Sequence, residues 1–429
     1  MKKYILILFI LLPVPLSSQK LLTLKECYEK ALQKNPIARE KDSYNQIWKI
    51  KDQDILKGWL PTLDANASFV YNSEVVDMRS VLSSIPIPGI ASAIKPLPHQ
   101  QYKVTFDINQ VIYDGGAIKG ARAFEKAGQG INEQQTEADL YKIRDKVNSS
   151  YFSILLLSRE KELLNDYLLL INKRIQSMRS ALNNGVIYKS DLDELISEKI
   201  GIEQQLGENE IKKASFLSVL SDLTGLTIDP LTNLAMPQQE DQLSFEISRP
   251  ELKLFDLRSE QLGAGVDILH SQRMPKAFGF ATAGYGNPPG GNFFKNEFAP
   301  YYILGAGIKW NIFDWNEVKN EKQIIKIQQE IIKNRKNDLN DDLKRMLISK
   351  NAEISSLQSI TERDAELIAI RERISAKAES QYENGTITVT DYLIEVNKEK
   401  EARITYEIHK INLAKAKIEF LNISGRDIQ

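Results

Sequence analysis

Few side chains in this sequence have the spacing that catalysis or metal binding requires. The three histidines, His99, His270 and His409, fall in different segments with no metal-ligand spacing, and the single cysteine, Cys27, has no partner for an internal disulfide. We find no phosphate-binding glycine loop, nucleophile elbow or paired-cysteine motif. The sequence therefore predicts no enzyme, no metal site and no cofactor, and Cys27 is predicted to be a small buried residue on a helix.

The acidic residues that do recur at matched positions are Asp191 and Asp391. Each lies six residues after an Asn-Gly pair, Asn184-Gly185 in one case and Asn384-Gly385 in the other. The two segments are offset by 200 residues and can be aligned over nine positions. A matched pair of this kind indicates an internal duplication, in which the acids have the same place in two copies of one structural unit.

The same offset of 200 residues relates Tyr113-Asp114 to Phe313-Asp314, whereas Pro61 matches Pro275 at an offset of 214. The first copy therefore has a longer connector between Pro61 and Asp114. We predict a first repeat at residues 19–225, a linker at 226–248 that lies outside the repeats, and a second repeat at 249–429.

The N-terminal residues 1–18 have the layout of a secretory signal peptide. Lys2-Lys3 precede an apolar run from Tyr4 to Leu12, and prolines and small residues follow. A membrane-spanning helix would need roughly 20 apolar residues, so this run is too short. Without its two lysines the chain has a side-chain charge of about −3, which argues against a nucleic-acid partner. We predict an exported protein.

Long stretches without helix breakers predict very long helices. No proline occurs from Ala117 to Asn184, and neither proline nor glycine from Asn316 to Asn384; a further run follows each stretch and ends at Gly225 or Gly425. Because Asn and Gly tolerate the left-handed conformation that ends a helix, each repeat is predicted to contain a helical hairpin, at 115–225 and at 315–425. Capping boxes are expected at the start of each returning helix, listed here by repeat: Ser190 with Asp193, and Thr388 with Asp391.

Alternating apolar and polar residues predict two strands in each repeat, in β-hairpins at 61–113 and 275–313. Strands of this length with one apolar face suit a membrane barrel, but four strands cannot close one, and open edges are too costly in lipid. Three copies would supply twelve strands. The alternatives are a soluble β-layer packed on helices or a non-conducting coiled-coil scaffold of the cell envelope, and the scaffold alone would not explain strands at matched places in both repeats.

In the order and spacing of its motifs the chain resembles the TolC family of outer membrane channels. The motifs are Leu22-Thr23-Leu24 before Asn35-Pro36, Leu60-Pro61 before the first strand, Tyr113-Asp114-Gly115-Gly116, Arg249-Pro250-Glu251-Leu252 and the two Asn-Gly turns. The resemblance covers essentially the whole exported chain. It implies a mostly helical fold with a membrane β-barrel: a homotrimer in which twelve strands cross the bacterial outer membrane and an α-helical barrel extends into the periplasm.

The resemblance further implies the function and the partners. It implies a passive exit duct of a tripartite efflux pump or a type I secretion system, surrounded by outer membrane lipid. The expected partners are a periplasmic adaptor (membrane fusion) protein and an inner-membrane transporter of the RND, ABC or MFS type. The helical tips would close the periplasmic end and meet the adaptor.

Particular residues match the family's tip motifs. The adaptor contacts fall on two short segments, listed residue by residue as Asn184, Gly185, Val186, Asn384, Gly385 and Thr386. The periplasmic gate falls on Asp191, Tyr382 and Asp391, with Glu395 as a further candidate. The chain departs from the family at Ile387, where relatives have the gate arginine, and at Ile394, where they have a second ring acid. Helix capping is the alternative role for Asp191 and Asp391.

Overall fold

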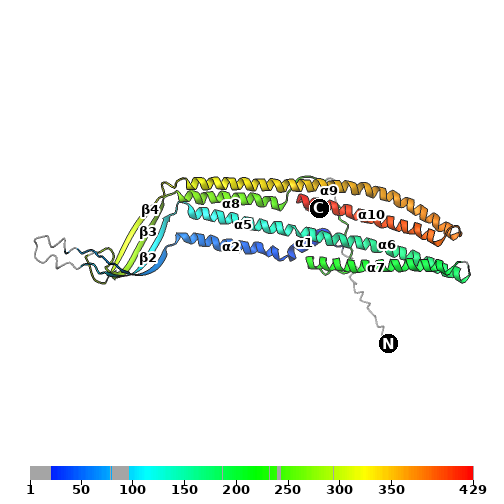
Figure 1. The fold of residues 1–429 in the computed structure, drawn as a ribbon, viewed down its shortest axis with the longest axis horizontal. Coiled ribbons are helices and arrows are strands. Elements are labelled where there is room, and N and C mark those ends of the chain that lie inside the picture. Colours follow the sequence, from blue (N-terminus) through cyan, green and yellow to red (C-terminus); the bar gives the residue numbers. More distant parts are fainter. Residues whose placement is uncertain are drawn as a thin grey trace, which may run out of the picture. The chain divides into compact units, whose positions relative to one another are not determined.

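Figure 1 shows the fold in a computed structural model, which describes residues 21–77, 79, 96–185, 187–230, 232–238, 243–292 and 294–428. The expected signal peptide at 1–18 lies outside these residues, as does Val186. The chain forms two compact units: unit 1 is Met1–Glu40, Thr136–Leu252 and Asp338–Gln429, and unit 2 is Lys41–Gln135 and Lys253–Asn337. Each unit therefore takes segments from both sequence repeats.

Unit 2 contains an antiparallel sheet of four strands among the described residues, in the order β1-β2-β3-β4. The strands are β1 (Thr62–Tyr71), β2 (Gln100–Tyr113), β3 (Lys276–Asn287) and β4 (Ala299–Lys309). The alternating pattern located all four, but it extended the last one too far. β4 ends at Lys309, so Trp310 and Ile312 lie beyond the strand although they continue its alternation.

One face of the sheet is apolar across all four strands. Leu63 pairs with Ile108 on β2, which pairs with Ala281 on β3, which in turn pairs with Leu304 on β4. Leu63 and Leu304 are 70% and 72% exposed. The described part of the chain leaves this apolar face exposed, and an exposed apolar patch of this kind marks an interaction surface.

The opposite face is polar on β1 and β2. Asp107 accepts hydrogen bonds from Asn66 at 2.9 Å, Thr105 at 2.7 Å and Thr282 at 2.6 Å. On β3 and β4 the same face is less polar, because it carries the rings of Phe278 and Phe280, which lie over glycines of β4. A sheet with one apolar and one largely polar face is suited to separating lipid from water.

Both strand-to-helix turns use an aspartate as the helix cap. Asp114 accepts from the backbone N–H groups of Gly116 and Ile118 at 2.8 and 2.6 Å, and helix α5 (Ala117–Tyr141) follows. Asp314 accepts in the same way from Asn316 and Val318 before α9 (Glu317–Glu383). A carboxylate here accepts hydrogen bonds from free amide groups and interacts favourably with the helix dipole.

The remaining helices have the bounds α1 (Leu24–Lys34), α2 (Glu40–Leu56), α6 (Ile143–Asn183), α7 (Lys189–Thr224), α8 (Pro250–Gln272) and α10 (Val389–Ser424). Two short 3₁₀ helices, η1 (Pro36–Arg39) and η2 (Lys57–Trp59), flank α2. The helix α9 is a single element of 67 residues, about 100 Å long at 1.5 Å per residue, as the absence of helix breakers predicted. Gly225 and Gly425 end α7 and α10 with φ of 72° and 86°.

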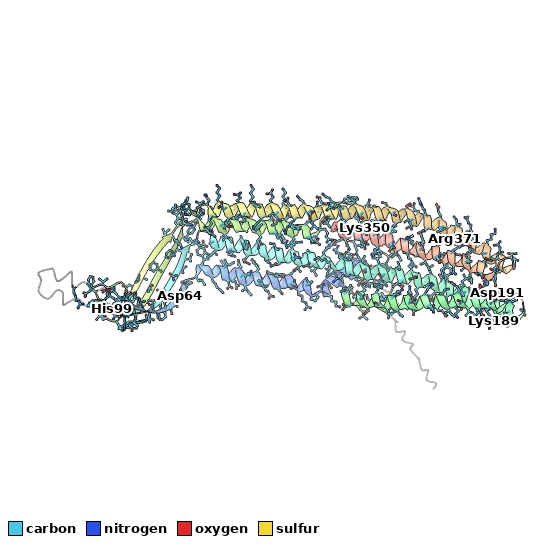
Figure 2. The ribbon with its side chains drawn as sticks, viewed as in Figure 1. Asp64, His99, Lys189, Asp191, Lys350 and Arg371 are labelled. Atoms are coloured by element: carbon cyan, nitrogen blue, oxygen red, sulfur yellow. The ribbon has the colours of Figure 1, made fainter. Side chains whose placement is uncertain are left out.

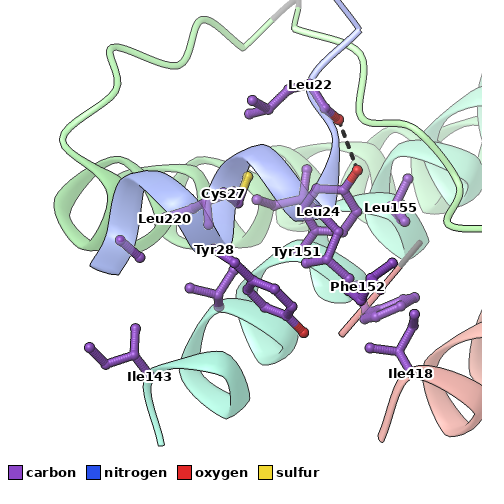
Figure 3. Packing of buried hydrophobic residues seen from close by; sticks show 14 of the residues in the cluster. Leu22, Leu24, Cys27, Tyr28, Ile143, Tyr151, Phe152, Leu155, Leu220 and Ile418 are labelled. Carbon is purple, nitrogen blue, oxygen red and sulfur yellow. Dashed lines mark hydrogen bonds between the residues drawn. The ribbon is translucent and has the colours of Figure 1, made fainter. Parts of the chain in front are cut away.

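The core of unit 1 is largest where α1 packs on α6 and α7 (Figure 3). Cys27 is fully buried there, as predicted, and so is Tyr151. The Tyr151 hydroxyl lies 2.8 Å from the carbonyl oxygen of Leu22 and 2.7 Å from that of Ala235. Leu22 also forms a parallel bridge with Leu234. The linker at 226–248 is thus fastened, over its described residues, to the start of the chain.

Candidate functional site

The two helical hairpins turn through the predicted Asn-Gly pairs. Gly185 and Gly385 adopt left-handed backbone conformations with φ of 70° and 69°. Their amides donate to the carbonyls of Leu182 at 3.0 Å and Tyr382 at 2.9 Å. A Cβ atom at either glycine would meet nothing within 4 Å, so backbone conformation and not crowding favours glycine. Both turns leave open space in which another chain can approach.

The cap of α10 is the one expected from the sequence. The Thr388 hydroxyl accepts from the Asp391 amide at 3.1 Å, and the Asp391 carboxylate accepts from the Thr388 amide at 3.2 Å. The hydrogen bond from the Thr388 side chain, followed by that from its backbone, holds the pKa of Asp391 below its ordinary value. Asp391 is exposed and remains charged at neutral pH.

The predicted cap of α7 is wrong. The helix begins at Lys189, so Ser190 and Asp193 lie inside it, and the capping position falls on Tyr188. Asp191 accepts from the Tyr188 amide at 3.1 Å, which matches the role of Asp391. Unlike Thr388, Tyr188 has no short hydroxyl side chain that could accept a hydrogen bond from the Asp191 amide. Figure 2 shows Asp191 beside Lys189 at the end of this hairpin.

A buried cation between the hairpins was missed by the sequence analysis. The Arg174 side chain on α6 is only 11% exposed and pairs with Glu379 and, at 3.1 Å, with Glu383 on α9. Its guanidinium lies over the rings of Tyr392 and Tyr382, at 5.2 and 5.8 Å from their centroids. An arginine in this position satisfies two carboxylates and two aromatic faces at once.

The sequence does hold a signal for Arg174. It lies three residues after Ile171 and four before Met178, two buried residues of α6, and therefore on the apolar stripe of that helix. A charged residue on an apolar stripe must find a partner, because burial of an unpaired charge is costly. The partners on α9 could not be named without knowing which helices meet.

Tyr382 lies between the two helical hairpins. Its ring stacks on that of Tyr392, with centroids 5.4 Å apart and planes inclined by 19°. Burial raises the pKa of the Tyr382 hydroxyl; nearby Arg174 lowers it, and the charge of Asp191 adds to the rise. A cavity of about 550 Å³ separates the tips here. Its walls include Arg174, Asp191, Tyr382, Gly385 and Ile387.

Two further contacts join α7 to α10 behind the tip. Thr390 donates to Glu194 at 2.7 Å, and the buried Lys400 donates to Glu198 at 2.9 Å. Together with Arg174 these polar bonds connect hairpin 1 (α6 and α7) with hairpin 2 (α9 and α10) along a shared hydrophobic cluster that contains Leu195 and Val396. The two hairpins are therefore packed together near their tips within the chain.

Glu395 is held within hairpin 2. Its carboxylate lies 2.7 Å from the ammonium of Lys398 and 3.5 Å from the guanidinium of Arg371 on α9. The side chain is 23% exposed. Two cations next to this carboxylate offset its charge, so it differs electrostatically from Asp391, which has no ion pair among the described residues.

The residues that could have done other chemistry are engaged elsewhere. His99 faces the Asn72 carbonyl at 2.8 Å, and His409 pairs with Asp364 at 2.6 Å. Burial, and secondarily the charge of Glu26, raises the pKa of the Cys27 thiol to about 12, so the thiol is unreactive. Among the described residues, histidine, cysteine and acidic side chains form no cluster that could hold a metal ion.

The arrangement defines a class of protein: a duplicated pair of long helical hairpins joined to a four-stranded sheet with one apolar face. Solved channel structures share this fold. A crystal structure of CusC superposes with a TM-score of 0.70 at 13% identity, covering 94% of this chain and 92% of CusC. The outer membrane protein VceC from Vibrio cholerae gives 0.66 at 14% identity, with 95% and 97% covered. The open state of the Neisseria gonorrhoeae outer membrane channel MtrE gives 0.64 at 14%, with 95% and 89% covered.

One family model matches part of the sequence. The model of the family described as outer membrane efflux protein matches residues 56–195. No curated protein matches the chain by sequence. The family match agrees with the expected resemblance to the TolC family over part of the chain. The solved structures confirm the expected mostly helical fold with a β-sheet. No described helix is long and apolar enough to cross a bilayer.

Proposed function

We propose that the chain is the protomer of a homotrimeric exit duct for efflux or secretion, passive in itself and gated at its helical tips. The observation that carries the proposal is the four-stranded sheet, whose apolar face is exposed and whose outer strands β1 and β4 each have a single partner among the described residues. In lipid the unpaired backbone groups of such edges would be too costly. Three copies would pair β4 of one protomer with β1 of the next and close a barrel of twelve strands.

Exposed apolar residues on α9 support the same assembly. Ile360, Leu367, Ile370 and Ile374 step by 7, 3 and 4 residues and are 36–45% exposed. This is the spacing of a coiled-coil seam, and the described part of the protomer leaves the seam uncovered. A neighbouring copy would cover it, so that the helices would form a continuous tube in the periplasm.

The gate is proposed at the tips. Asp191, Tyr382 and Asp391 would lie around the threefold axis, with Glu395 behind them, and three copies of an exposed acid would favour cations. Because Ile387 replaces the family's gate arginine, Arg174 would hold the hairpins together within each protomer through Glu379 and Glu383. Opening would separate these groups.

The partners are proposed to be a periplasmic adaptor and an inner-membrane transporter of the RND, ABC or MFS type. The adaptor would contact the two turns, which comprise Asn184, Gly185 and Val186 in hairpin 1 and Asn384, Gly385 and Thr386 in hairpin 2. The open space around Gly185 and Gly385 supports this assignment, because a partner backbone can approach both closely. The transporter would supply the energy, since the duct performs no bond chemistry.

Single-channel conductance in planar bilayers tests the proposal. The wild type is compared with Asp391→Ala, with Asp193→Ala as the matched control, since Asp193 is exposed inside the same tip region without a capping role. A further variant carries cross-linked cysteines across the tips in a Cys27→Ala background. We expect small cation-selective currents that change with Asp391→Ala, do not change with Asp193→Ala and vanish on cross-linking. A protein that never conducts and stays soluble without detergent would instead be an envelope scaffold.

A further inference from the structure

The turn after β4 differs from its counterpart after β2 in one unexpected residue. The repeats align Asp114-Gly115-Gly116 with Asp314-Trp315-Asn316, and both aspartates cap the following helix in the same manner. In both turns the two residues after the aspartate have positive φ: 72° and 93° in the first, 50° and 67° in the second. In the second turn a tryptophan therefore adopts the positive φ that glycine adopts in the first turn.

Glycine is required in the first turn for two reasons. Its φ is left-handed, and a Cβ atom on Gly115 would lie 2.7 Å from the Cβ of Met274. In the second turn only the backbone constraint applies, because the side chain points into open space. A bulky residue at positive φ is an outlier that the surrounding structure must stabilise.

Hydrogen bonds from the Asn316 and Val318 amides to Asp314 stabilise the backbone of this turn, but they do not involve the tryptophan side chain. Trp315 is 84% exposed, and its one ring contact is the edge of Phe313, with centroids 4.8 Å apart. Its indole N–H has no hydrogen-bond acceptor among the described residues. By contrast, the indole of Trp310 donates to the Arg273 carbonyl at 3.0 Å. The described residues therefore leave most of the Trp315 indole, including its N–H group, without a contact.

The surroundings of Trp315 indicate which contact would suit it. The apolar face of β4 ends with Ile308, which is 77% exposed, and Trp310, Ile312 and Phe313 follow it with 57–68% of their surface exposed. Trp315 completes this group where the strand gives way to the helix. Indole rings concentrate at the boundary between hydrocarbon and water, because the ring is apolar while its N–H needs a polar partner.

We propose that Trp315 is an interfacial anchor whose indole lies in the lipid headgroup layer at the periplasmic face of the outer membrane. It fixes the depth at which the sheet ends and the helices begin. The inference rests on the proposed function, since it requires the sheet to be embedded in the membrane. A lipid surface is favoured over a second copy of the chain because Trp315 continues the exposed apolar group that begins with Ile308, on the sheet face proposed to meet lipid.

Depth-dependent fluorescence quenching tests the anchor. The full-length chain with Trp48, Trp59 and Trp310 changed to Phe retains Trp315 alone and is reconstituted in phosphatidylcholine vesicles that carry bromine at shallow or deep acyl positions. We expect Trp315 emission to be quenched more than twofold better by the shallow bromines. Emission that no brominated lipid quenches would put the indole in water or between subunits and overturn the proposal.

A second measurement separates anchoring from a merely structural role. With Trp310 as the only fluorescent tryptophan, its depth profile is recorded in chains with Trp315→Phe, Trp315→Gly and Trp315→Tyr. Glycine fits the turn better than tryptophan, so a purely structural role predicts an unchanged profile. An anchor predicts a broadened or shifted profile for Gly and for Phe, which lacks the polar N–H, and a partial return towards a sharp profile for Tyr. An unchanged profile in the Gly variant would overturn the proposal.

The outcomes also separate the anchor from the proposed function. A chain that enters vesicles and conducts, but whose Trp315 is not quenched, would refute the anchor alone. A chain that neither enters vesicles nor conducts would refute both.

Discussion

The two hairpin tips share their turn and differ in almost everything that surrounds it. Gly185 and Gly385 have nearly the same φ, and an aspartate closes the following helix in both. Hairpin 2 has the hydroxyl cap, two paired carboxylates and the stacked tyrosines, whereas hairpin 1 contributes the cation Arg174. The two copies of the repeat thus share the backbone conformation of the turn. Their side chains differ and are complementary, since the cation of hairpin 1 pairs with carboxylates of hairpin 2.

The largest expected effect breaks that complementarity. Arg174→Ala leaves Glu379 and Glu383 without their partner and two tyrosine rings without their cation. We expect the tips to be destabilised by about 2 kcal/mol, below the range for a fully buried pair because both carboxylates are half exposed. Hydrogen exchange of the tip amides in the detergent-solubilised protein would measure it.

Two variants serve as controls for Arg174. Arg174→Lys keeps the charge but loses the planar fork, so its effect should be smaller. Arg179→Ala removes an exposed arginine of the same helix and should change little. Equal acceleration of exchange by Arg174→Ala and Arg179→Ala would show that the ion pairs of Arg174 do not join the hairpins.

The next effect tests what the tips share. Gly185→Ala and Gly385→Ala should each cost about 1 kcal/mol, because alanine disfavours the left-handed conformation and neither site has a steric contact. The two costs should be equal within error in thermal unfolding of the detergent-solubilised protein. Gly201→Ala, inside α7 and equally free of contacts, should stabilise by about 0.5–1 kcal/mol. Unequal costs at the two turns would mean that the tips are not equivalent even in their backbone.

A cap exchange sharpens the difference between the tips. Thr388→Ala removes the hydroxyl cap of α10 and should cost about 1 kcal/mol, while Tyr188→Thr should add a cap to α7 and gain a similar amount. Tyr188 is 80% exposed, so the exchange sacrifices little packing. Amide exchange in the first turns of α7 and α10 would report both effects. A Tyr188→Thr chain with unchanged exchange in α7 would argue that Asp191 alone suffices as a cap.

The smallest effect is a pH dependence confined to hairpin 2. Hydrogen bonds from Thr388 depress the pKa of Asp391, so the folded tip binds this proton less readily than the unfolded chain does. The stabilisation is therefore present above about pH 4 and is lost as the pH falls through the lowered pKa of the folded state. The difference in α10 exchange between wild type and Asp391→Asn should shrink as the pH is lowered towards that value. A difference that stays constant would exclude a contribution from the charge.

Much of the fold could be predicted because its signals are local and occur twice. The alternation around Leu63 and Ile108, the long stretches without helix breakers and the Asn-Gly pairs each follow from neighbouring residues. The end of β4 was misplaced because Trp310 and Ile312 continue the alternation after the ladder has stopped. A strand ends where its backbone hydrogen bonds to the neighbouring strand end, and the alternation of apolar and polar residues does not reveal that point.

The candidate site was predictable only where it is local. Thr388 and Asp391 form their cap within four residues, and that expectation is confirmed. The pair Ser190 and Asp193 had the same spacing, but α7 starts one residue before Ser190, and the repeat alignment with Thr388 would have pointed to Tyr188. Arg174 could not be paired from the sequence, because its partners are more than 200 residues away on α9.

The free edges of β1 and β4 have a consequence for the genetics of the protein. In the proposed trimer no subunit can complete its own sheet, so each copy depends on two others for every edge it places in lipid. One copy with a damaged edge strand would spoil the whole ring, including its two sound neighbours. A cell that expresses both a normal and an edge-defective allele should therefore lose much more than half of its functional ducts, and the defective allele should act as dominant.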